Sequence, residues 1–389
     1  MRNGKIVVLA MLLLAALVFN VHAGGGKDNV IKIGAALALT GDNSAWGLSE
    51  RNALEMEVKK INAAGGVLGK QIKLISYDTR ADVAEAVNVV QRLIDEGVTA
   101  IIGPAQSGTA IAATAVTEPN KVAFVATTAT NPRVTVDDKT GKVRASAFRA
   151  CFIDPFQGTV AAQFVFRDLR KRSAAIIYDV GSDYSTWLNN YFAEEFKKFG
   201  GVVLAQEAFR TGELDFRAIL GKIRPTNPDV LFIPTQQKEA SLIMSQAASL
   251  GFTCTYIGGD GWATPDLITL GGSAVEGAYL VNIASNEDPD IQDFIKEYKS
   301  IYKELPVMPN PVMAIDALYA IIDCIKRTNS TEPATIMVAL ESVKNLPVLS
   351  GILTIDPATH NPLNKPAYIE KIVNGKFVLF KKFVTVSSN

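Results

Sequence analysis

Short apolar segments alternate with amphipathic helical patterns along this chain, and the alternation occurs twice. The first series predicts strands at 31–39, 73–78, 99–103 and 122–126, with helices between them at 50–63, 83–96 and about 108–117. The second series predicts strands at 174–179, 202–208, 229–234 and 255–259, with helices at 184–199, 215–224 and 238–250. Strands that alternate with helices form mainly parallel sheets covered on both faces. We therefore expect an α/β protein with two doubly wound open-sheet lobes.

The pattern changes after Gly277. A strand follows directly, and the chain then continues through three helical segments, at 290–304, 312–327 and 333–343. Its last part is typical of antiparallel β-structure, with a hairpin that turns at Asn374-Gly375, a preferred two-residue turn sequence. We interpret this part as a return of the chain that completes each of the two lobes.

The composition argues against several classes of function. Lys plus Arg and Asp plus Glu each total 39 in 389 residues, so the basic excess typical of nucleic-acid-binding proteins is missing. The only histidines are His22 and His360, which argues against most zinc sites and most Ser-His or Cys-His triads. No phosphate-binding glycine motif follows the first strand. We expect no catalytic residue, metal, cofactor or nucleic-acid partner. An enzyme on a doubly wound sheet is the less favoured alternative.

The N-terminus predicts export. Arg2 and Lys5 precede an apolar run at 6–19, and Val21-His22-Ala23 then offers a cleavage site after Ala23. The apolar run has 14 residues, fewer than the ~20 that span a bilayer, so a membrane anchor is the weaker interpretation. The mature protein is expected in the periplasm or outside the cell.

Three cysteines, Cys151, Cys254 and Cys324, are widely separated and form no C-x-x-C pair. A disulfide between two of them stays open as an alternative in an oxidising compartment. The favoured interpretation is three small buried apolar side chains.

Polar side chains follow several predicted strands, where open α/β sheets bind their ligands. In the first half these are Ser107, Thr109 and a cluster at Thr127, Thr128 and Thr130. In the second half they are Tyr184, Gln236 and Asp260. Each also has a purely structural interpretation, as a helix N-cap, a loop residue or a turn residue.

Hydroxyls and free N–H groups at a helix N-terminus bind anions without a fixed positive charge. The first half therefore offers a receptor for a carboxylate, and Asp260 in the second half offers a partner for an ammonium group. An α-amino acid carries both groups. Trp46, Tyr184 and Trp262 are candidates for apolar or stacking walls, because both tryptophans are expected in polar loops.

Six phrases of the sequence, in order, resemble the branched-chain amino-acid binding proteins of periplasmic ABC transporters. They are INAAGGVLGKQIKL, AIIGPAQSG, FVATTATNP, AAIIYDVGSDYS, DFRAILGKIRPTNPDVLFIP and YIGGDGW. The resemblance covers essentially the whole mature chain. It implies a type I periplasmic binding fold, in which two lobes joined by three crossover segments close on a ligand, and a membrane permease–ATPase complex as the partner. The protein is expected to act as a monomer.

Position by position, the resemblance implies a carboxylate receptor made of Ser107, Thr128 and Thr130. It implies a ligand contact at Tyr184 and an ammonium partner at Asp260. Trp46 stands where a tyrosine is usual at the cleft mouth, and Gln236 stands where leucine-type binders have a tyrosine.

The size of the pocket is expected to depend on Gln236 together with two further wall candidates, Phe156 and Trp262. The departure at Gln236 leaves the choice of side chain open, whether branched-chain or another apolar or small polar amino acid. The alternative ligands are an aromatic or aliphatic carboxylate, a short amide or urea. A sensory ectodomain is a further alternative.

The resemblance also implies the lobe boundaries. The crossovers are expected near 148–152, 275–279 and 349–352. The segment 1–23 is then the signal peptide, lobe 1 comprises 24–149 and 279–350, and lobe 2 comprises 150–278 and 351–389.

Overall fold

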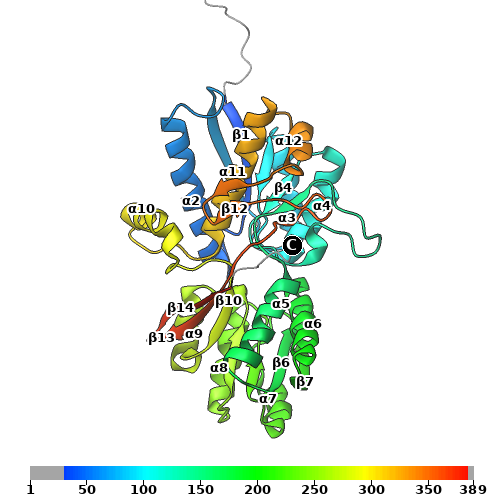
Figure 1. The fold of residues 1–389 in the computed structure, drawn as a ribbon, viewed down its shortest axis with the longest axis vertical. Coiled ribbons are helices and arrows are strands. Elements are labelled where there is room, and N and C mark those ends of the chain that lie inside the picture. The colour runs from blue at the N-terminus through cyan, green and yellow to red at the C-terminus, as the bar shows by residue number, and fades with distance from the viewer. Residues whose placement is uncertain (1–29, 384–389) are drawn as a thin grey trace, which may run out of the picture. The chain divides into compact units, whose positions relative to one another are not determined.

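The computed structural model describes residues 30–383, and its first large sheet has five strands in the order β2-β1-β3-β4-β5. The strands are β1 (Val30–Leu37), β2 (Gln71–Asp78), β3 (Ala100–Ile102), β4 (Phe124–Ala126) and β5 (Ala147–Arg149). The pairs β1–β3, β3–β4 and β4–β5 are parallel. The connecting helices are α2 (Ser44–Ala63), α3 (Val83–Asp95) and α4 (Ser107–Asn120), drawn in blue and cyan in Figure 1.

The second sheet has seven strands in the order β14-β13-β10-β9-β8-β6-β7. Its parallel part consists of β6 (Ser173–Asp179), β7 (Val202–Phe209), β8 (Val230–Phe232), β9 (Thr255–Gly258) and β10 (Tyr279–Asn282). The strands β13 (Ala367–Val373) and β14 (Lys376–Phe383) add an antiparallel hairpin beside β10. The helices are α5 (Asp154–Gln163), α6 (Asp183–Lys198), α7 (Arg217–Ile223), α8 (Gln237–Ser249) and α9 (Pro265–Gly271).

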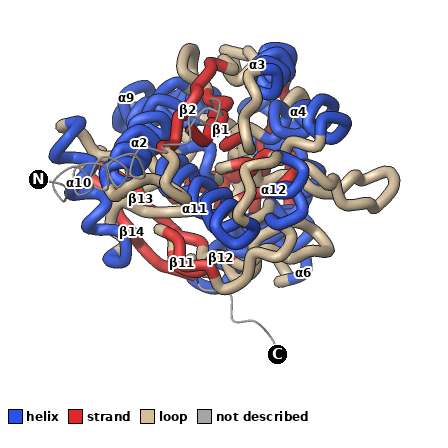
Figure 2. Tube along the Cα trace, turned by 90° about the horizontal axis from the view of Figure 1, so that it is seen from above, coloured by secondary structure: helices blue, strands red, loops and turns tan. Residues whose placement is uncertain are grey.

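After β10 the chain returns to the first sheet and adds a layer to it. The returning elements are α10 (Gln292–Tyr302), α11 (Asn310–Thr328), α12 (Pro333–Leu340), β11 (Leu346–Val348) and β12 (Gly351–Leu353). Helix α11 packs against α2 and β3, and Figures 1 and 2 show α2 and α11 as neighbours. Most residues of α11 are buried, which explains why its sequence is apolar around most of the helix.

The chain thus passes between the two sheets three times, and this agrees with the α/β fold of two mainly parallel sheets expected from the sequence. The first passage lies between β5 and α5, close to the expected position. The second differs from the expectation, which assigned residue 279 onward to lobe 1. Strand β10 belongs to the second sheet because it pairs in parallel with β9 and antiparallel with β13, so the passage follows Asn282.

The third passage also comes later than expected. His360 stacks on Phe148 with ring centroids 4.1 Å apart, and Asn361 accepts a hydrogen bond from Thr135. These contacts hold the chain beside the first sheet until it enters β13. The part of 351–389 that precedes β13 was assigned to lobe 2, but it packs with lobe 1. Its side-chain contacts with the first sheet, and not its position along the chain, determine where it lies.

The expected elements agree with the observed ones except at a few ends. Helix α2 begins at Ser44 rather than near 50, so Trp46 lies in a helix and not in a polar loop. Helix α5 was not among the expected elements. The C-terminal hairpin turns at Asn374 and Gly375 with φ of 52° and 66°, as the type I′ turn requires.

Two sequence expectations concern the ends and the cysteines. The expected signal peptide lies outside the described residues. Between residues 30 and 383, no helix has both the length and the apolar character needed to cross a membrane. All three cysteines are free thiols; Cys151 and Cys324 are buried, whereas Cys254 is partly exposed.

Candidate functional site

A small cavity lies where loops from the two sheets meet. The empty space between the side chains that line it, including space open to solvent, is about 360 Å³. The first sheet and its added layer contribute six residues and the second sheet four. They are Trp46, Ala105, Gln106, Ser107, Thr128 and Asn310 from the first, and Tyr184, Gln236, Asp260 and Gly261 from the second. The structure therefore brings together six of the seven residues that the sequence analysis assigned to ligand binding.

The first side of the cavity is built on the N-terminus of α4. Ser107 is the first helical residue, after the N-cap position of Gln106, and the first N–H groups of any α-helix lack partners within it. Its hydroxyl accepts a hydrogen bond from the backbone N–H of Asn131, at 3.3 Å. Thr109, by contrast, donates to the carbonyl of Gln106 at 2.8 Å and is engaged locally. Ser107 and the helix terminus thus form a neutral surface suited to an anion.

The loop after β4 is held by a buried arginine. Arg149 is fully buried and donates to the carbonyls of Ala129 and Asn131, at 2.6 and 2.8 Å. Thr128 lies in this loop, lines the cavity and donates to the carbonyl of Ala105 at 3.3 Å. The guanidinium therefore fixes the loop that carries Thr128 without itself entering the cavity.

The second side presents a carboxyl group. Asp260 is 7% exposed and accepts a hydrogen bond from Gln157 Nε2 at 2.8 Å. Burial raises the pKa of Asp260 to about 6, while hydrogen bonds from Gln157 and Tyr184 oppose that rise. Above this pH the site contains a desolvated negative charge, which is the natural partner of an ammonium group.

Small residues beside Asp260 make room for Tyr184. A Cβ at Gly259 would lie 2.3 Å from the tyrosine hydroxyl, and one at Gly261 would lie 3.2 Å from its ring. The backbone N–H of Gly261 donates to the same hydroxyl at 3.3 Å. The glycines on both sides of Asp260 therefore allow the close approach of Tyr184 from α6, rather than marking only an ordinary turn.

Polar contacts join the two sides around the cavity. Asp42 accepts hydrogen bonds from Lys238 Nζ through its carboxylate, at 2.7 Å, and from Gln237 through its backbone carbonyl, at 2.6 Å. Asp183 pairs with Arg133 at 2.8 Å, and its carbonyl accepts from Asn131 at 2.9 Å. Asp42, Asn131 and Arg133 belong to the part of the chain that builds the first sheet. These contacts therefore bridge the two halves at the rim.

Three predicted site residues do not line the cavity. Thr130 is fully buried, and its carbonyl accepts from the N–H of Asp154 at the first passage between the sheets. Phe156 is partly buried and packs edge-on against Phe152, with centroids 5.6 Å apart. Trp262 is fully buried in the core of the second sheet, where it covers the face of Gly258, so it is not a wall of the cavity.

The structure adds residues that the sequence analysis did not single out. Gln157 contacts Asp260, and Asn310 and Gln106 line the cavity. Gln157 lies on α5, which was not predicted, and Asn310 lies at the start of α11, far from the phrases that follow strands. Only the position of Gln106, directly before Ser107 after a strand, carried a signal that sequence reasoning could have used.

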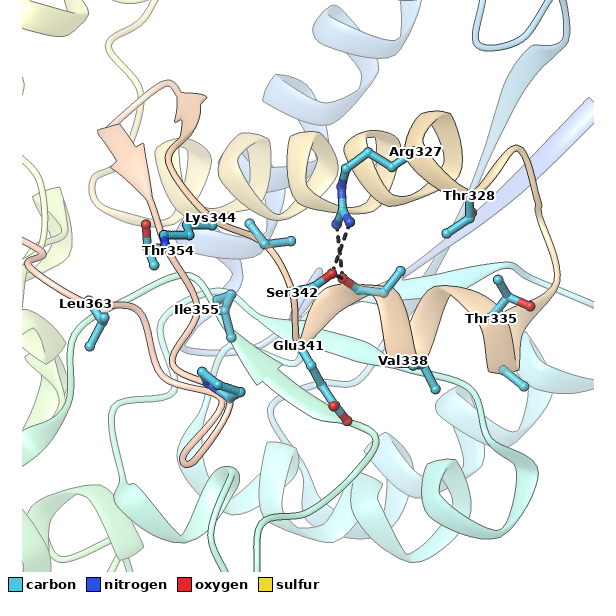
Figure 3. A pocket seen from close by; sticks show the side chains of 14 residues that line it. Arg327, Thr328, Thr335, Val338, Glu341, Ser342, Lys344, Thr354, Ile355 and Leu363 are labelled. Carbon is cyan, nitrogen blue, oxygen red and sulfur yellow. Dashed lines mark hydrogen bonds between the residues drawn. The ribbon is translucent and has the colours of Figure 1, made fainter.

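A larger hollow, of about 1770 Å³, lies between α11, α12 and the segment that contains Thr354 and Leu363 (Figure 3). The guanidinium of Arg327 donates there to Ser342 Oγ and the carbonyl of Ala339, both at 3.0 Å, and is thereby occupied. No predicted site residue lines this hollow. Among residues 30–383, no cluster of three His, Cys, Asp or Glu side chains could hold a metal ion.

Comparisons with known proteins give the family. Residues 30–376 match the periplasmic binding protein family. A Leu/Ile/Val-binding protein homolog of Brucella suis is 26% identical over 359 residues, which are 91% of this chain and 94% of the relative.

Two solved structures are similar throughout. The leucine-binding protein LivK of Thermotoga maritima is 33% identical, with a TM-score of 0.83 over 91% of this chain and 98% of its own. The branched-chain amino acid transporter substrate-binding protein LivJ of Streptococcus pneumoniae, in complex with isoleucine, is 28% identical, with a TM-score of 0.83 over 92% and 99%. The fold is thus that of type I periplasmic binding proteins. The chain belongs to the periplasmic binding protein family, as a solute-binding protein of an ABC transporter and not an enzyme.

Proposed function

We propose that the protein captures an apolar α-amino acid in the periplasm and delivers it to the membrane permease of an ABC importer. The observation that carries this proposal is the opposition of Ser107 and Thr128 to Asp260 across one cavity of about 360 Å³. The hydroxyl side and the N-terminus of α4 receive the α-carboxylate, and Asp260 receives the α-ammonium. LivJ of Streptococcus pneumoniae, which is 28% identical, has isoleucine bound, and this favours a branched-chain ligand.

The ligand would act by stabilising the arrangement in which the two sides meet. A ligand that touches both sides at once binds this arrangement more tightly than a separated one, and so shifts the population toward it. The bridges at Asp42 and Asp183 also form only when the sides meet. The transporter would then recognise the closed form, with the hinges at the three passages between the sheets.

The mature protein, cleaved after Ala23, tests the proposal in a thermal-shift screen. The panel contains the standard amino acids, benzoate, 4-methylpentanoate, acetamide and urea. A ligand that binds only the native state raises the melting temperature. At a ligand concentration of a hundred times its Kd, the free energy of unfolding increases by ~2.7 kcal/mol. We expect shifts with leucine, isoleucine or valine. A shift with benzoate or 4-methylpentanoate and none with amino acids would replace the proposed ligand class by carboxylates without an ammonium group.

The affinity for an amino acid should fall on the acid side of pH 6. Burial raises the pKa of Asp260 to about 6, so the carboxylate that pairs with the ammonium is increasingly protonated below that pH. Calorimetry between pH 6.5 and 4.5 should show that the affinity for the amino acid falls by a factor that approaches ten per pH unit, which is ~1.4 kcal/mol of binding free energy. 4-Methylpentanoate has no ammonium group, so its binding should not decline in this way above about pH 5.5, where its own carboxylate remains ionised. If the affinity for the amino acid did not change down to pH 4.5, an ionic pair with Asp260 would be excluded.

The rim bridges should slow dissociation of the ligand. Replacing both Arg133 and Lys238 by alanine removes the two ion pairs that bridge the halves, each worth ~0.2–1 kcal/mol, together with the pair that Arg133 forms with Asp138. The dissociation rate should therefore rise ~2–30-fold in stopped-flow measurements. Salt screens such pairs, so 0.5 M NaCl should shrink the difference from the unmodified protein. Lys198→Ala removes two ion pairs on α6, away from the cavity, and serves as the control. An equal rise of the dissociation rate in this variant would refute the role of the rim.

A further inference from the structure

A buried glutamate stands behind the first side of the cavity. Glu50 lies on α2, one helical turn after Trp46, and its side chain is fully buried. Its Oε1 accepts a hydrogen bond from Thr127 Oγ1 at 2.5 Å, and the amide of Asn310 faces the same carboxyl. Its Oε2 is buried and accepts no well-aligned hydrogen bond. Glu50 thus contacts two segments that reach the ligand cavity and is not itself a lining residue.

Both contacts lead directly to the cavity wall. Thr127 immediately precedes Thr128, and Asn310 lines the cavity itself at the start of α11. The same face of α2 holds the segment before Asn310 in place. Trp46 Nε1 donates to the carbonyl of Met308 at 3.3 Å, and Ser49 Oγ accepts from the N–H of Val307 at 2.9 Å. One face of helix α2 therefore contacts both the loop after β4 and the start of α11, and Glu50 contacts the two together.

We propose that Glu50 is a positioning residue for the ligand carboxylate, holding Thr127–Thr128 and Asn310 in the receiving geometry while it is protonated and weakening binding when it ionises. The physical reason is charge: an ionised Glu50 adds a second, poorly solvated negative charge behind a surface that receives an anion, and like charges repel strongly where water is excluded. The inference rests on the proposed function, because it requires a ligand with a carboxylate.

The environment of Glu50 favours the protonated form. Burial raises the pKa of Glu50 to about 7, while hydrogen bonds from Thr127 and Asn310 oppose the rise. The titratable side chains on the packed elements have other partners. Arg51 pairs with Glu55 on α2, Tyr298 of α10 contacts Ser49, and Asp316 of α11 pairs with Lys365. The neutral form is thus lost as the pH rises through about 7.

The test is the pH profile of affinity for L-leucine by calorimetry, between pH 6 and 8.5. The affinity of the unmodified protein should fall ~3–10-fold above pH 7. Titration of a single group can change the affinity by at most tenfold per pH unit, and the expected fall corresponds to a partial titration of Glu50. Glu50→Gln keeps the hydrogen-bonding shape without the charge. It should match the unmodified protein at pH 6 and lack the decline. Glu50→Ala should bind more weakly at every pH, with Glu50→Gln as the rescue.

Glu57→Gln is the matched control, since Glu57 is a second buried glutamate of α2 that pairs with Tyr319 and Lys60 away from the cavity. It should keep the decline above pH 7. The inference is overturned if Glu50→Gln declines like the unmodified protein, if both Glu50 variants lose affinity equally at every pH, or if the unmodified protein shows no decline. Should Glu50→Ala not fold, Glu50→Gln alone decides.

The outcomes also separate the two proposals. If leucine does not bind but benzoate does, the proposed function fails and the same profiles are recorded with benzoate. If no carboxylate binds, both proposals fail.

Discussion

Asp260→Ala is expected to abolish tight binding of the amino acid. The ligand ammonium would remain in a cavity where only its carboxylate partner has been removed, and truncating one member of a buried charge pair costs ~2–5 kcal/mol. At ~1.4 kcal/mol per factor of ten, the loss of affinity is at least ~30-fold. Isothermal titration calorimetry at pH 7 measures it.

The same substitution should change the melting temperature of the ligand-free protein little. Asp260 is buried, and its pKa of about 6 means that its charge is held at a cost at neutral pH. That cost offsets the loss of its hydrogen bond from Gln157. Asp266→Ala, at an exposed position on α9, serves as the control and should bind normally. Unaltered affinity in Asp260→Ala would remove this residue from the site.

Lys365→Met is expected to destabilise the fold by ~3–5 kcal/mol. Lys365 Nζ lies 2.9 Å from Asp316 Oδ2, and the two side chains are only 3% and 0% exposed. Removing the ammonium leaves a buried carboxylate without a cation, and only the hydroxyl and the backbone N–H of Ser350 still donate hydrogen bonds to it. The pair ties the segment that enters β13 to α11, so the third passage between the sheets should loosen first. Urea or thermal unfolding of the ligand-free protein measures the effect.

Two controls separate the buried charge from the loss of a lysine. Lys381→Ala breaks a partly exposed pair with Asp168 and should change stability by less than ~1 kcal/mol. The double variant Lys365→Met/Asp316→Asn removes the unpaired charge and should recover much of the loss. If the double variant were as unstable as Lys365→Met, the unpaired charge would not be the cause.

Most of the fold could be predicted because its signals are local. The apolar runs at β1, β3, β6 and β8 and the turn at Asn374-Gly375 fall where the sequence placed them. The site could be predicted in part for a related reason. Ser107, Tyr184 and Asp260 each follow a strand, and parallel strands bring their carboxyl ends to one edge of a sheet.

Residues of similar sequence context nevertheless have different surroundings. Thr128 and Thr130 lie two positions apart in one loop, yet Thr128 lines the cavity and Thr130 is buried beside Asp154. Trp262 is two residues from Asp260, but its ring packs against Gly258, which has no side chain, and therefore lies in the core. The direction in which a loop side chain points depends on the space left by neighbouring elements that are distant in the sequence. The local sequence pattern therefore cannot predict it.

The order of residues by itself determined the alternation of strands and helices, the polar character of the strand ends and the pairing of a hydroxyl-rich half with an acidic one. Only the tertiary structure decided that Gln157, 103 residues before Asp260, donates to its carboxylate, and that Glu50 stands behind Thr127 and Asn310. The physical reason is range. Hydrogen bonding and periodicity along one element are set by near neighbours, whereas the burial that shifts the pKa of Glu50 and Asp260 arises only when distant segments pack together and exclude water.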